Sequence, residues 1–171
     1  MNSRYSNRIG RKRTWLHIRG VPVASVILGS MIAPLMPVIA QNPFFPPFGL
    51  LMLLAWRLLR PEIWPLWIGA PLGLIDDLMN GQPLGSAMFL WTIILLALDF
   101  EGQRHRWRDY WHGWLLGTIA IGFALAGSWL AVDLAGQGGE IVQIIPQFLY
   151  SVALFPFIVR VCAALDKWRL P

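Results

Sequence analysis

Few side chains in this sequence have the type and spacing that catalysis requires. Asp76 and Asp77 are adjacent carboxylates, a kind of pair that holds Mg²⁺ in enzymes of pyrophosphate chemistry. Such a site also needs further acids or basic groups that clamp a phosphate, and no Lys or Arg lies between Arg60 and Arg104. We therefore expect that the chain is not an enzyme and that it has no catalytic residues.

The other residues that bind metals or act as nucleophiles are few and scattered. His17, His105 and His112 lack the spacing of metal ligands, and Cys162 is the single cysteine of the chain. The sequence contains no G-x-S-x-G, phosphate-loop, H-E-x-x-H or C-x-x-C motif. We expect no metal and no cofactor.

The composition is typical of a chain that lies in a lipid bilayer. Hydrophobic residues make up 56% of the 171 residues and charged residues 13%, and the mean hydropathy is +0.54. Because a soluble domain carries about 25% charged residues, a water-soluble monomer of this composition would expose large apolar patches. These values exclude an ordinary soluble enzyme, a disordered chain and a disulfide-rich secreted domain. The basic pI of about 10.1 arises from short clusters beside apolar runs, so we expect no nucleic acid as a partner.

Six apolar runs lie between the basic clusters. They cover residues 21–40, 48–59, 63–79, 84–98, 114–135 and 141–164. The first run has twenty residues without a charge, and as a helix it spans a hydrocarbon core of about 30 Å. The sequence therefore predicts an all-α, polytopic membrane protein with a bundle of six transmembrane helices. We expect a basic cytoplasmic tail over residues 1–19 and a single membrane domain over residues 20–171.

The positions of the basic residues predict how the bundle is oriented. The connections at 41–47, 80–83 and 136–140 contain no Lys or Arg, whereas all fourteen lie in or beside the connections near 57–62 and 99–113 and the two termini. Cytoplasmic segments carry such an excess of Lys and Arg, so both termini are expected in the cytoplasm. Seven of the ten tryptophans also lie beside basic segments, where we expect them at the membrane interface: Trp15, Trp56, Trp64, Trp107, Trp111, Trp114 and Trp168.

Two runs admit another interpretation. The run 48–59 reaches only about 18 Å as a helix, so the alternative is a re-entrant hairpin over 48–79. That hairpin would hold Arg57, Arg60 and Glu62 at membrane depth, at roughly 3 kcal/mol for each charge. We favour two crossings, with the Arg57 side chain extending to water.

The run 21–40 resembles the core of a cleaved signal peptide. Its length, however, exceeds the ~7–15 residues that are usual for the apolar core of a signal peptide.

One predicted helix face carries small residues and an acid. Gly69, Gly73 and Asp77 are spaced i, i+4 and i+8, so they share one side of a helix. The two glycines form a groove in which another backbone can approach closely, and Asp77 then points into a protein contact. The alternative is that Asp77 is hydrated at the membrane interface. Asp76 is rotated by about 100° from this face, and we expect it to face water.

A second polar stripe lies on the last run. Gln143, Gln147 and Ser151 also have the spacing i, i+4 and i+8. This stripe and Asp77 are expected in the half of the membrane away from the basic clusters. We therefore predict a hydrogen bond from Gln147 to Asp77.

The segment from residue 73 to residue 85 resembles the signature of the MreD family of bacterial rod shape-determining membrane proteins. The family shows G-x-x-x-D followed by a G-x-x-x-G turn before a further span. The matching residues are Gly73, Asp77, Gly81 and Gly85. Asp76 stands where the family usually has an apolar residue. The length, the six runs and the short, proline-bounded second run are also similar to the family.

The resemblance implies a non-enzymatic scaffold of the cell-elongation complex, which directs peptidoglycan synthesis, in the bacterial inner membrane. Its expected partners are the membrane helix of MreC, the actin-like MreB, the glycosyltransferase RodA and a penicillin-binding transpeptidase. The Gly69–Gly73–Asp77 face and the turn with Gly81, Pro83 and Gly85 would hold the bundle in shape, and an apolar outer face would receive MreC. The family also resembles in fold the substrate-binding subunits of energy-coupling-factor vitamin transporters. A small-molecule-binding transporter subunit is therefore the alternative function.

Overall fold

The structure is a computed structural model that describes residues 15–35, 45–104, 110–136, 142 and 144–169. Within these residues the chain forms six α-helices and two short 3-10 turns and no strand, which confirms the predicted all-α class. The elements are α1 (Trp15–Leu35), α3 (Phe48–Leu59), η1 (Pro61–Ile63), η2 (Leu66–Ile68), α4 (Gly69–Asn80), α5 (Ser86–Arg104), α6 (Tyr110–Leu134) and α7 (Ile144–Arg169). The helix α1 thus begins inside the predicted tail 1–19, of which residues 1–14 lie outside the described part.

The apolar run 63–79 is not one continuous helix. Trp64 and Pro65 are extended, η2 follows them, and the α-helix begins only at Gly69. A proline disfavours helical backbone in the residue before it and has no N–H to donate, so Pro65 favours the break in the helix at Trp64 and Pro65. The helix α4 therefore has twelve residues.

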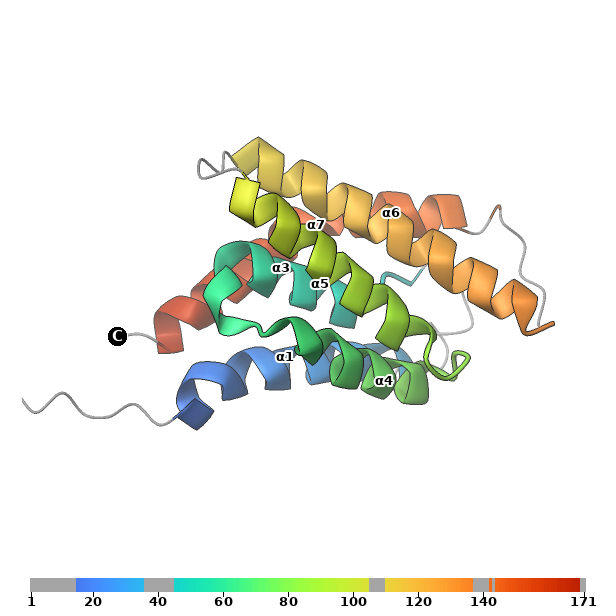
Figure 1. Cartoon of the computed structure of the whole chain (residues 1–171), viewed down its shortest axis with the longest axis horizontal. Helices are drawn as coiled ribbons and strands as arrows, with labels where there is room; N and C mark the ends of the chain where they lie inside the picture. Colours follow the sequence, from blue (N-terminus) through green and yellow to red (C-terminus); the bar gives the residue numbers. More distant parts are fainter. Residues whose placement is uncertain (1–14, 36–44, 105–109, 137–141, 143, 170–171) are drawn as a thin grey trace, which may run out of the picture.

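The helices lie along one long axis, and the short helix α3 occupies the middle of the bundle (Figure 1). It packs against α1, α6 and α7, while α4 packs against α1 and α5. Its side chains form the centre of the apolar core and are almost completely buried: Leu50, Leu51, Leu53, Leu54, Ala55 and Trp56. Because α1, α6 and α7 surround α3, the sides of α3 are in contact with other helices of the bundle.

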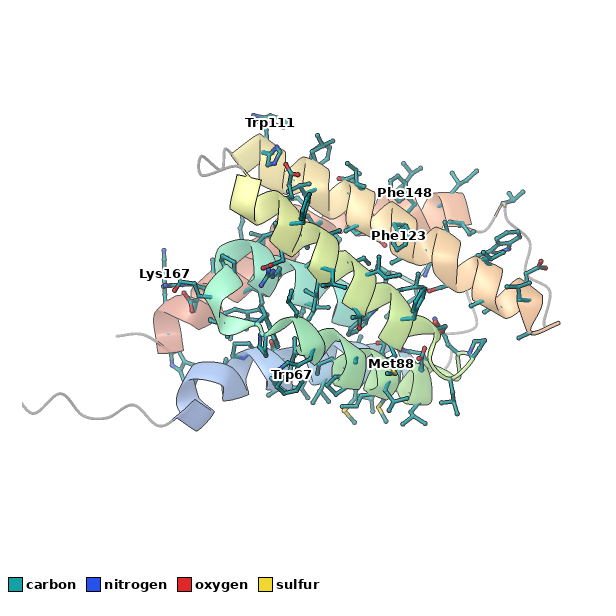
Figure 2. All side chains as sticks on the ribbon, in the orientation of Figure 1. Trp67, Met88, Trp111, Phe123, Phe148 and Lys167 are labelled. Carbon is teal, nitrogen blue, oxygen red and sulfur yellow. The ribbon has the colours of Figure 1, made fainter. Side chains whose placement is uncertain are left out.

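The outer surface of the bundle is strongly apolar. Two helical segments, Trp111–Leu134 and Ile144–Trp168, are long and apolar enough to cross a membrane, and two shorter helical segments are apolar as well. Only 28% and 22% of the apolar windows in the two long segments are buried inside the protein. Large side chains such as Trp67 and Met88 project outward (Figure 2). A water-soluble monomer rarely exposes apolar surface on this scale.

The two ends of the bundle differ in their residues. The starts of α1 and α6 and the ends of α5 and α7 lie at one end, and the α4–α5 turn lies at the other (Figure 1). Trp111, which is 74% exposed, and Lys167 share the first of these ends (Figure 2).

Trp56 and Trp64 were predicted at the membrane interface, but both are buried in the core. The Trp56 indole N–H donates a 2.8 Å hydrogen bond to the Ser25 hydroxyl. The prediction was wrong for these two because neighbouring helices cover them.

Candidate functional site at the α4–α5 hairpin

A tight turn joins α4 to α5. Gly81 follows the last residue of α4 with a φ of 65°, and Gly85 precedes α5 with a φ of 96°. Both values lie in the left-handed region, where a side chain would be strained, so the turn requires glycine at these positions. Pro83 lies between them, and its carbonyl accepts a 3.1 Å hydrogen bond from the Ser86 N–H.

The Asp77 carboxylate caps the first turn of α5. Its oxygens accept hydrogen bonds of 2.9 Å from the Gly85 N–H, the Ser86 hydroxyl and the Ala87 N–H. The side chain is almost completely buried, because Asp77 is only 1% exposed. A helix start has N–H groups without intrahelical partners and a partial positive charge, so a carboxylate there is doubly stabilised. Asp77 thus serves α5 as an N-cap that is supplied from α4.

The two glycines of the same face allow α4 and α5 to pack backbone to backbone. A Cβ atom on Gly73 would lie 2.6 Å from backbone atoms of Ala87 and Met88. A Cβ atom on Gly69 would lie 3.1 Å from backbone atoms of Trp91 and Thr92. Gly69, Gly73 and Asp77 therefore all face α5, in agreement with their spacing, and none of them lies on the outer surface of the bundle.

The predicted hydrogen bond from Gln147 to Asp77 is wrong. The Gln147 amide instead donates a 2.8 Å hydrogen bond to the Phe45 carbonyl, and α5 supplies the donors to Asp77. Ser151, one turn further along α7, donates to the Gln147 carbonyl. Gln147 thus joins α7 to the segment that enters α3. The other predicted residue of this stripe, Gln143, lies outside the described residues.

Asp76 was expected to face water but is buried, with 7% exposure. Its carboxylate accepts a hydrogen bond from the Ser30 hydroxyl of α1. A Cβ atom on Gly49 would lie 3.0 Å from the Asp76 Oδ1 atom, so the start of α3 also approaches this carboxylate closely. The prediction failed because α1 and α3 both pack over the side of α4 that carries Asp76.

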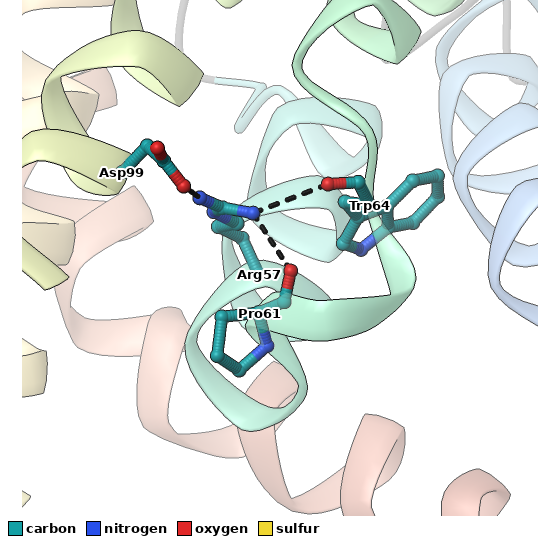
Figure 3. Close-up of polar contacts among 4 residues, drawn as sticks. All are labelled: Arg57, Pro61, Trp64 and Asp99. Carbon is teal, nitrogen blue, oxygen red and sulfur yellow. Dashed lines mark hydrogen bonds and ion pairs between the residues drawn. The ribbon is translucent and has the colours of Figure 1, made fainter. Parts of the chain in front are cut away.

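A buried arginine holds together the opposite end of the bundle. The Arg57 guanidinium pairs with Asp99 of α5 and donates hydrogen bonds of 2.8 Å and 3.2 Å to the carbonyls of Pro61 and Trp64 (Figure 3). Arg57 is only 4% exposed, so its side chain does not extend to water as expected. The sequence analysis missed this cluster, although a single Arg in an apolar run and an Asp near the end of another run are a recognisable signal for a buried pair.

The comparison with protein families decides the identity. The model of the family described as rod shape-determining protein MreD matches residues 16–163. The chain belongs to the MreD family. Comparisons with curated proteins and with solved structures gave no match. The matched range includes the whole α4–α5 hairpin and both partners of the Arg57–Asp99 pair. Whether the hairpin residues contact partner proteins stays a prediction.

The chemistry of the hairpin is structural in character. Within the residues that the structure describes, no group of three or more His, Cys, Asp or Glu side chains is placed to hold a metal ion. The Asp77 carboxylate is engaged with the start of α5. In this MreD-family chain the arrangement fixes two helices relative to each other.

Replacing Gly73 by alanine is expected to lower the stability of the purified protein by about 1–3 kcal/mol, because the new methyl group would overlap the α5 backbone. Thermal unfolding in detergent should show this as a melting temperature that is lower by several degrees. Gly102→Ala in α5 is the matched control, because a Cβ atom there meets nothing within 4 Å. Equal melting temperatures for the two variants would contradict the close packing at Gly73.

Proposed function

We propose that this MreD-family chain is a non-enzymatic scaffold of the cell-elongation complex in the bacterial inner membrane. The observation that carries the proposal is the match of the rod shape-determining family over residues 16–163. The match gives no support to the alternative of a vitamin-transporter subunit. On this proposal the chain organises wall-synthesis proteins in the membrane and does not itself make or break bonds.

In this proposal all six helices cross the bilayer. The two long apolar segments of α6 and α7 and the apolar exterior support the crossing. The nineteen residues of α5 reach about 28 Å as a helix, close to the thickness of a hydrocarbon core. The helix α3 reaches only about 18 Å, but it is enclosed by α1, α6 and α7, so a short helix costs little there.

Both termini are proposed to lie in the cytoplasm. The charge distribution supports this, because Lys167 and the starts of α1 and α6 lie at one end of the bundle (Figures 1 and 2). Arg60 pairs with Asp166, the residue before Lys167, and so belongs to the same end. The α4–α5 turn lies at the other end, and the sequence has no Lys or Arg over residues 61–103. The positive-inside rule places the end with the basic residues in the cytoplasm.

The proposed partners are MreC, MreB, RodA and a penicillin-binding transpeptidase. The apolar exterior suits a contact with the single membrane helix of MreC, since helices associate in lipid through close packing of such surfaces. The Asp77-capped hairpin would contribute by keeping α4 and α5, and hence this exterior, in one shape.

Affinity purification from native membranes tests the proposed function. The chain would be tagged at its C-terminus and expressed from its own locus, and the recovered proteins would be identified by mass spectrometry. We expect MreC and wall-synthesis proteins to be recovered, and depletion of the chain to convert rods into spheres. Recovery of transporter ATPase subunits, together with an unchanged cell shape on depletion, would contradict the proposal.

A further inference from the structure

A cavity of about 400 Å³ opens at the end of the bundle that carries the α4–α5 turn. The second half of α1, the start of α3, the end of α4 and parts of α5, α6 and α7 enclose it. Its walls combine aromatic rings, among them Phe48, Trp91 and Trp129, with several polar side chains. The polar side chains are Ser30, Asp76, Asn80, Gln82, Ser128 and Gln147. This mixture and this volume are typical of a small-molecule site.

The Asp76 carboxylate gives the cavity a negative charge, and no basic residue lies in the described part of the cavity wall. Every described residue of the cavity wall belongs to the ranges 20–56, 61–103 or 109–159, and these ranges contain no Lys or Arg. The Ser30 hydroxyl and the Asn80 side-chain amide both donate to Asp76, whereas an ionised carboxylate has about four acceptor positions. Asp77 differs, because the start of α5 satisfies it. A buried carboxylate with spare acceptor positions and no basic neighbour favours a cationic ligand.

The class of cation follows from the walls. A divalent metal ion is usually held by more than one charged ligand, and the described residues contain no cluster of three or more His, Cys, Asp or Glu. An organic ammonium group needs one carboxylate, hydrogen-bond acceptors and aromatic faces, and the cavity offers all three. The carbonyl oxygens of Asn80, Gln82 and Gln147 side chains are of the kind that accept from N–H donors.

We propose that this cavity binds an organic ammonium group, with Asp76 as the counter-ion and the aromatic walls around it. The ammonium group can come from a soluble amine or from the headgroup of an aminophospholipid. The proposal goes beyond the scaffold function and does not rest on it, because ligand binding is measured on the purified protein and scaffold function in cells.

Thermal unfolding of the purified full-length protein in lipid-free detergent provides the first test. Ethanolamine is the probe, and ethylene glycol is its uncharged control. At a tenfold excess over Kd we expect ethanolamine to raise the melting temperature by about 3–5 °C and ethylene glycol to leave it unchanged. The second arm compares nanodiscs of phosphatidylethanolamine with nanodiscs of phosphatidylglycerol. Stabilisation by ethanolamine indicates a soluble amine, stabilisation only by phosphatidylethanolamine indicates a lipid headgroup, and stabilisation by neither overturns the proposal.

Variants assign the effect to the cavity. Asp76→Asn keeps the shape of the side chain and should abolish the stabilisation, whereas Asp133→Asn, an exposed acid on α6, should retain it. Ser128→Phe keeps Asp76 but fills the cavity, so it should also abolish the effect and serves as the test if Asp76→Asn does not fold. An undiminished shift in either cavity variant would overturn the proposal.

Discussion

The substitution Asp77→Leu is expected to destabilise the protein by about 3–5 kcal/mol. Leucine is similar in size but accepts no hydrogen bond, so the N–H groups of Gly85 and Ala87 and the Ser86 hydroxyl lose their acceptor. Each buried donor that is left unpaired costs about 1–3 kcal/mol, and the loss of charge at the start of α5 adds to this. Thermal unfolding in detergent should show a melting temperature that is lower by about 10 °C.

Two variants make the Asp77 experiment specific. Asp77→Asn keeps one oxygen acceptor and should lose about half as much stability, because it can still cap part of the first turn. Asp133→Leu removes an exposed acid from α6 and should have little effect. Asp77→Leu should also recover less MreC from membranes and fail to maintain rod shape. If this variant were as stable as the original chain, the capping role would be wrong; if it kept MreC and rod shape as well, the hairpin would have no part in the function.

The substitution Arg57→Met is expected to cost about 3 kcal/mol. Methionine fills a similar volume but removes the guanidinium from Asp99 and the donor from the carbonyls of Pro61 and Trp64. Removing one member of a buried ion pair costs about 3–5 kcal/mol, and the lower end applies because the Asp99 side chain is 33% exposed. Arg57→Lys should recover only part of the loss, since an ammonium cannot reproduce the planar array of donors.

Arg60→Met is the matched control for Arg57. Arg60 pairs with Asp166 at 3.0 Å, but its side chain is 52% exposed, so we expect a loss below about 1 kcal/mol. The double variant Arg57→Met/Asp99→Leu should be more stable than Arg57→Met alone, because it also removes the carboxylate that has lost the Arg57 guanidinium. Equal losses for Arg57→Met and Arg60→Met, or strictly additive effects in the double variant, would show that Arg57 is not held in a buried pair.

The sequence predicts the helices well, because hydropathy and proline mark them directly. The range 48–59 is reproduced by α3, and the turn predicted from Gly81 and Gly85 appears between α4 and α5. The face formed by Gly69, Gly73 and Asp77 follows from helical spacing alone. The division of 63–79 into η2 and α4 required more weight on Pro65 than hydropathy gives it.

Contacts between distant segments could not be predicted in the same way. The helical spacing shows that Asp77 points into protein. It does not show that the start of α5, rather than Gln147, supplies the hydrogen-bond donors. The sequence predicted that the Arg57 side chain reaches water. This prediction failed, because the position of the side chain depends on how α5 places Asp99 beside it. The sequence predicted that Asp76 faces water. This prediction failed, because the packing of α1 and α3 over α4 buries the side chain. In each case the missing information is the arrangement of helices around the residue.

The proposed arrangement in the membrane is tested most directly by thiol labelling in cells. A Cys162→Ser background would carry one new cysteine at a time, either Leu84→Cys in the α4–α5 turn or Trp168→Cys near the end of α7, both at exposed positions. With the inner membrane intact, a membrane-impermeant maleimide should label the cysteine at position 84 and should reach the one at 168 only after the membrane is permeabilised. Labelling at 168 from outside, or protection at 84, would contradict the account.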